Sequence, residues 1–140
     1  MNQYTFKMLK LGMTETFEVS ITDKMMSQFM DITGDSNPLH TDPLYASGFE
    51  ATNGKCAVYG LLSAAFLSTL AGMYLPGKYS IIHHIDTEFV KIVHVGDKLK
   101  VSGTVKEMDE RFNTIILKVA IENQNGEKVC RGKMRIGVLK

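Results

Sequence analysis

The sequence predicts an α+β domain in which one apolar helix packs against an antiparallel sheet. Residues 60–75 are nearly all apolar and end at Pro76-Gly77, which predicts a helix that is buried on every side but too short to span a membrane. Four later segments alternate apolar and polar side chains as strands do: 79–90, 97–108, 112–123 and 127–139. Short connections at 109–111 and 124–126 favour antiparallel hairpins, and such a sheet can wrap around the helix.

The first part of the chain is less regular. Residues 14–20 alternate weakly and predict a further strand. A helix follows, because Thr22 can cap its start, apolar residues recur at helical spacing, and Gly34 can end it. The stretch 35–55 is rich in turn formers, and one short helix is expected to begin at Pro43. An irregular stretch of this length in a small domain is typical of a functional loop.

Composition and charge indicate one domain over residues 1–140 and exclude several classes of partner. A hydrophobic content of 44% supports a single core. Sixteen basic and fifteen acidic residues give a net charge of +1 without charge runs, so we expect no nucleic-acid partner. The start of the chain lacks the apolar core of a signal peptide, and no apolar run reaches the roughly 20 residues of a membrane span. We therefore expect a cytoplasmic protein without a membrane partner.

The densest polar cluster is residues 34–42, directly after the first predicted helix. Asp35 and His40 are five residues apart across a turn at Asn37-Pro38, so both side chains can reach one small molecule such as water. Adding water across a conjugated double bond needs one group that takes a proton from water and another that delivers a proton to carbon. Histidine exchanges protons near neutral pH, which suits it to this task. The alternative is that Asp35 only caps a turn and His40 is a surface residue.

Three further features bear on the chemistry. Gly60 opens the apolar helix, where unpaired N–H groups and a partial positive charge can polarise a carbonyl oxygen. A glycine needed only for close packing of helix and sheet would produce the same sequence. His83 and His84 are strand neighbours that point to opposite faces, and Cys56 and Cys130 lack zinc-ligand or disulfide spacing. We therefore expect no metal site and two reduced thiols.

Four segments resemble one known family in the same order along the chain. The run ITGDSNPLHTDPLYA (32–46) is similar to the signature of the MaoC-like dehydratases, also called R-specific enoyl-CoA hydratases. Residues 59–81, 89–108 and 122–132 resemble the helix, strand pair and late hairpin that follow in that family. The resemblance implies a hot-dog fold, in which an antiparallel sheet wraps around a long central helix. It also implies a homodimer, possibly a higher homo-oligomer, with active sites near the interface.

Carried over by position, the resemblance assigns five residues of this chain. Asp35 and His40 are the catalytic pair, and Gly60 supplies the oxyanion N–H. Asn37 keeps the turn, and Ser68 matches a helix serine that supports the catalytic loop. The implied reaction interconverts trans-2-enoyl and (R)-3-hydroxyacyl thioesters without a metal or redox cofactor, and CoA or acyl carrier protein enters only as part of the substrate. Asp35 takes a proton from water and His40 protonates C2, although the opposite assignment also satisfies the proton count.

The chain departs from the family pattern at two positions. Tyr59 stands where the family commonly has histidine, and we expect it to line the thioester site and tune substrate binding. Lys91 replaces a common proline at a strand end, where we expect little effect. Two other hypotheses stay open. One is a non-catalytic hot-dog subunit that binds an acyl chain or completes a heterodimer, which Tyr59 keeps open and the presence of both Asp35 and His40 argues against. The other is an acyl thioesterase, in which water attacks C1 and releases the thiol.

Overall fold

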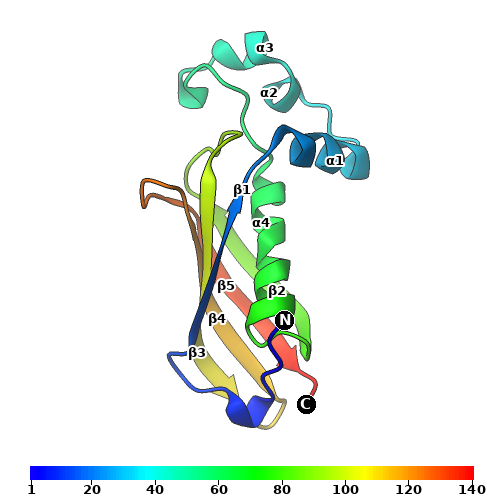
Figure 1. Ribbon diagram of the computed structural model, residues 1–140, viewed down its shortest axis with the longest axis vertical. Coiled ribbons are helices and arrows are strands. Elements are labelled where there is room, and N and C mark those ends of the chain that lie inside the picture. The colour runs from blue at the N-terminus through cyan, green and yellow to red at the C-terminus, as the bar shows by residue number, and fades with distance from the viewer.

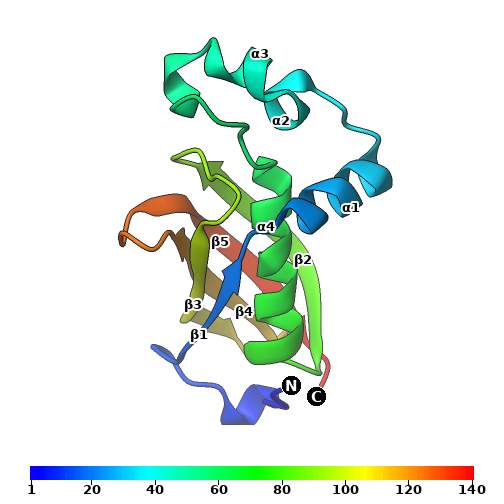
Figure 2. The same ribbon diagram turned by 45° about the horizontal axis from the view of Figure 1, so that its top comes forward.

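A five-stranded antiparallel sheet curls around one central helix in the computed structural model, which describes residues 1–140 (Figures 1 and 2). The strand order is β1-β3-β4-β5-β2, and the helix is α4 (Gly60–Thr69). This arrangement confirms the predicted α+β hot-dog fold. The strand bounds are Thr14–Ser20 for β1, Ser80–Phe89 for β2, Lys98–Asp109 for β3, Thr114–Glu122 for β4 and Lys128–Val138 for β5.

The two predicted hairpins are present, and they form the centre of the sheet. Strands β3 and β4 pair up to Asp109 opposite Thr114, and β4 pairs with β5 up to Glu122 opposite Lys128. The sequence did not place β2, which crosses over to pair with β5 and forms one edge of the sheet. Apolar side chains on this edge strand stay exposed: Ile81 by 47%, Ile85 by 41% and Phe89 by 51%.

The core lies between α4 and the inner face of the sheet, where alternate strand residues point inward. Its members that are 0% exposed include Leu67, Leu70, Leu99, Leu117 and Met134. The helix continues beyond Thr69 as a π-helical turn, η3 (Leu70–Tyr74). No helix is long and apolar enough to cross a membrane.

The prediction that this helix is buried on every side is wrong for a single chain. Leu61 is 66% exposed, and Ala65 and Ser68 follow it on the same helical face and are also exposed. A helix lying on the inner face of one curled sheet is covered on one side only, so its outer face needs another partner to become buried. Leu and Ala content cannot distinguish these two situations.

The segment before α4 lies beyond one end of the sheet, above the N-terminus of that helix (Figure 1). It begins with α1 (Asp23–Thr33), where Thr22 Oγ accepts from Met25 N at 3.2 Å and Gly34 ends the helix with φ 72°, as predicted. The predicted helix at Pro43 is α3 (Pro43–Ser47). Three short helices were not expected: α2 (Pro38–Thr41), η1 (Phe6–Met8) and η2 (Glu50–Thr52).

Candidate active site

The loop that carries Asp35 is held by its own side chains. Asp35 Oδ1 accepts from Asn37 N at 3.1 Å, and Asn37 Oδ1 accepts from Leu39 N at 2.9 Å. The second bond caps α2, whose first residue, Pro38, needs no N–H partner. Asn37 therefore caps this turn, and Asp35 also serves as a turn cap. One Asp35 oxygen makes this bond, and the carboxylate remains exposed.

His40 is half-buried in α2, and its ring is oriented by one hydrogen bond. Its Nδ1 lies 2.7 Å from the carbonyl oxygen of Ala57. A carbonyl oxygen can only accept, so we assign the Nδ1 proton to this bond. Nε2 is then the ring atom that is free to gain or lose a proton. This orientation comes from the segment before α4, 17 residues further along the chain.

Tyr59 connects the two members of the predicted pair. Its hydroxyl donates to the backbone carbonyl oxygen of Asp35 at 2.6 Å, and its ring packs against the His40 ring with centroids 4.1 Å apart. The Phe29 ring of α1 packs against the Tyr59 ring as well, with centroids 4.9 Å apart. Burial raises the pKa of the Tyr59 phenol, and the nearby Asp35 charge raises it further, so the hydroxyl stays a donor at neutral pH. Tyr59 itself is 3% exposed.

One pocket of about 340 Å³ lies at the N-terminus of α4. Its lining is mainly apolar and includes His40 and Gly60 but neither Asp35 nor Tyr59. Tyr59 thus lies beneath the loop, whereas we had expected it to line the site. A larger pocket of about 610 Å³ lies near the chain termini and contains neither histidine nor aspartate. The smaller pocket is lined by Leu39, His40, Ala57, Val58, Gly60, Ser63, Phe89, Val90, Lys91, Ile92, Val93 and Val129.

The first turn of α4 has free backbone donors, and its first residue, Gly60, lines this pocket. The N–H groups of Gly60 and Leu61 have no acceptor within the protein, and no side chain caps the helix. A Cβ at Gly60 would lie 3.2 Å from ring atoms of Phe89. Gly60 therefore allows close packing and also leaves a donor uncovered, so both sequence interpretations of this glycine have support.

Two serines of α4 differ sharply in their surroundings. Ser68, predicted to support the loop, is exposed and its hydroxyl makes no hydrogen bond within the chain, so that role stays a prediction. Ser63, which the sequence analysis did not single out, is 3% exposed and lines the pocket, and its Oγ has no hydrogen-bond partner. Its spacing of three from Gly60 was the available signal, because helix residues three apart share a face. An unpaired buried hydroxyl costs about 1–3 kcal/mol.

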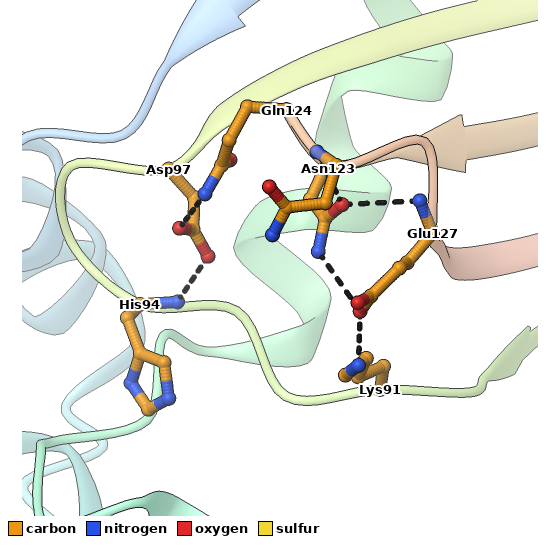
Figure 3. A network of polar contacts seen from close by, with 7 residues as sticks. Lys91, His94, Asp97, Asn123, Gln124 and Glu127 are labelled. Atoms are coloured by element: carbon orange, nitrogen blue, oxygen red, sulfur yellow. Dashed lines mark hydrogen bonds and ion pairs between the residues drawn. The ribbon is translucent and has the colours of Figure 1, made fainter.

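A polar network supports the opposite wall of the pocket (Figure 3). Lys91 forms an ion pair with Glu127 of the β4–β5 hairpin, and this lysine lowers the pKa of the Glu127 carboxyl. Asp97 accepts from His94 N and from Gln124 Nε2, both at 2.9 Å. These contacts join the β2–β3 connection to the hairpin. Lys91 lines the pocket and its exposed ion pair joins this segment to the hairpin, while the small effect expected of the missing proline stays a prediction.

The fold and this site define a hot-dog protein with a candidate acid–base site at the start of its central helix. Residues 10–126 match the family model described as MaoC like domain. The chain therefore belongs to the MaoC-like family.

Relatives with solved structures or assigned names agree with this placement. The chain is 33% identical to the (R)-specific enoyl-CoA hydratase of Aeromonas caviae, covering 77% of this chain and 79% of that protein. It is 30% identical to the 3-hydroxybutyryl-CoA dehydratase of Methylorubrum extorquens, covering 74% of this chain but just 64% of that protein. The unliganded R-hydratase PhaJ1 of Pseudomonas aeruginosa superposes with a TM-score of 0.90 at 28% identity, covering 97% and 86% of the two chains.

Proposed function

We propose that the chain interconverts trans-2-enoyl and (R)-3-hydroxyacyl thioesters by adding or removing water. The observation that carries the proposal is one pocket that is lined both by the oriented His40 and by Gly60, whose N–H group is free. Such a pocket combines a proton-transfer group with donors for a carbonyl oxygen. The names of the Aeromonas and Methylorubrum relatives describe the two directions of this reaction.

In the hydration direction the thioester carbonyl oxygen accepts from the Gly60 N–H, which stabilises the negative charge that develops as the enolate forms. Asp35 takes a proton from water as the water oxygen attacks C3, and His40, which carries a proton on each ring nitrogen, delivers its Nε2 proton to C2. The proton that Asp35 has gained then returns to His40 Nε2, which restores the pair for the next turnover. Dehydration reverses each step. Because Ala57 holds Nδ1, Nε2 is the atom that exchanges its proton in either assignment of the pair. Water addition involves no net oxidation, so the proposed reaction needs no redox cofactor, and in this proposal Asp35 and His40 carry the proton transfers without a metal.

The pocket supports a short acyl chain. Its volume of about 340 Å³ lies near the lower end of the range for ligand pockets, roughly 300–1,000 Å³. Its lining is mostly apolar, as an acyl chain requires. The thioester carrier, CoA or acyl carrier protein, would remain outside this volume.

We also propose that the chain works as a homodimer in the cytoplasm. The β2 strand has an unpaired edge, with exposed apolar residues at Ile81, Ile85 and Phe89. Unpaired edges and apolar patches are normally covered in native proteins. The exposed face of α4 at Leu61 adds to the apolar surface that a second copy could bury.

The test is a panel of crotonyl, octenoyl and longer enoyl thioesters, on CoA and on acyl carrier protein, followed at the enoyl absorbance. We expect turnover to be fastest with the shortest chains. A thiol-trapping dye run in parallel distinguishes the thioesterase, which would release free thiol. Binding of acyl thioesters without turnover would instead identify the non-catalytic subunit.

A further inference from the structure

We propose that Ser63 is a substrate-contacting residue whose hydroxyl donates to the same thioester carbonyl oxygen as the Gly60 N–H. The inference rests on the proposed function and adds a second donor to its oxyanion site. It starts from the location of Ser63, whose side chain is buried on the core side of α4 and also lines the pocket.

Ser63 Oγ is the one buried side-chain oxygen or nitrogen of the protein that has no hydrogen-bond partner. Buried polar groups are almost always paired, so a lone exception calls for a physical reason. The usual partner of a helix serine is the carbonyl four residues earlier, here that of Tyr59. That carbonyl already accepts from Leu62 N at 3.0 Å and from Ser63 N at 3.3 Å, which occupies both of its lone pairs.

The helix geometry directs the Ser63 side chain toward the free donors. Cα–Cβ bonds in a helix tilt toward its N-terminus, so the side chain at position 63 leans over the first turn of α4. The Gly60 and Leu61 N–H groups in that turn lack acceptors. An oxygen bound there can accept one hydrogen bond from the backbone and another from the Ser63 hydroxyl, because a carbonyl oxygen has two lone pairs.

The thioester carbonyl is the substrate group that fits this place. Its oxygen carries no proton, so it can accept from both the Gly60 N–H and the Ser63 hydroxyl and leaves neither of them unpaired. Negative charge grows on its oxygen as the enolate forms, and hydrogen bonds to charged oxygen are stronger than those to neutral oxygen. The Ser63 contact should therefore favour the transition state over the bound substrate and affect kcat more than KM.

The experiment compares Ser63→Ala with Ser63→Thr and with Ser102→Ala. The alanine variant loses an unpaired hydroxyl, so its Tm should rise or stay level while kcat falls about 10- to 100-fold and KM changes little. Ser63→Thr keeps a hydroxyl and should retain most of kcat. Ser102 of β3 does not line the pocket, and its hydroxyl donates to Ala120 O at 3.3 Å. Its alanine variant should therefore lose stability and keep activity.

Two outcomes would overturn the role of Ser63 and leave the proposed function standing. One is that the wild-type protein turns over enoyl thioesters and the Ser63→Ala variant keeps the same kcat. The other is a parallel fall in Tm and activity, which would identify a structural hydroxyl that is satisfied within the chain. A wild-type protein that is inactive across the whole thioester panel would overturn the proposed function, and the Ser63 contact with it.

Discussion

Replacing Tyr59 by phenylalanine removes one hydrogen bond at the candidate site and leaves the packing in place. The hydroxyl donates to Asp35 O at 2.6 Å, while the ring packs against His40 and Phe29. Phenylalanine keeps both ring contacts. We expect looser positioning of Asp35 relative to His40, because their shared support then acts through the His40 ring alone.

The magnitude follows from the surroundings of the bond. A neutral hydrogen bond contributes about 0.5–1.5 kcal/mol. Asp35 is exposed, so water can replace the lost donor at its carbonyl, which places the cost in the lower half of that range. We expect a Tm lower by about 2–4 °C and kcat/KM lower by a few-fold. Tyr59→Ala also removes the buried ring and should cost about 3–5 kcal/mol, as other large core truncations do.

The assay is steady-state turnover of a short enoyl thioester together with thermal melting, and Tyr74→Phe is the matched control. Tyr74 packs its ring on Phe17 at 4.8 Å, and its hydroxyl makes no hydrogen bond, so this variant should behave as wild type. The raised pKa of Tyr59 adds a pH criterion. Its neutral phenol contributes fully below the unfolded pKa, and the contribution is lost as pH rises through the folded pKa, so the Tyr59→Phe deficit should be constant across neutral pH.

A loss in Tyr59→Phe as deep as that in His40→Ala would refute the positioning role and make the phenol a proton donor. A silent variant, in both Tm and turnover, would show that the 2.6 Å bond adds nothing measurable. Tyr59→His, which introduces the residue common in the family, should remain active.

Three other predictions concern the pair, the helix start and the sheet edge. Asp35→Asn and His40→Ala should each lower kcat by about 10²–10⁴ without unfolding the protein. The double variant should be little worse than the poorer single one. Near-wild-type turnover in either single variant would refute the assignment of the pair. Gly60→Ala keeps the backbone N–H but should lower Tm and kcat, because its Cβ would lie 3.2 Å from the Phe89 ring and would crowd the donor; wild-type Tm and kcat in this variant would contradict the close approach. Ile85→Glu on the exposed β2 edge should shift sedimentation from a dimer to a monomer, and a wild-type protein that sediments as a monomer at micromolar concentration would contradict the proposed assembly.

The sequence by itself determined the five strands, the helices α1, α3 and α4, and the turn at residues 35–39. Alternation at period two located the strands within a residue or two, and Thr22 and Gly34 marked the ends of α1. The short connections predicted the two hairpins, because strands joined by so few residues pair as antiparallel neighbours. The bonds from Asn37 N to Asp35 and from Leu39 N to Asn37 join residues two apart, so they followed from local geometry.

Tertiary structure alone decided the contacts between segments that are distant in sequence. The place of β2 beside β5 depends on a crossover, which periodicity does not encode. Tyr59 reaches Asp35 across 24 residues, and Ala57 orients His40 across 17, because the loop folds back over the N-terminus of α4. Ser63 and Ser68 look alike as serines in an apolar helix. Neither hydroxyl has a hydrogen-bond partner within the chain, but Ser63 is buried whereas Ser68 is exposed and can bond to water.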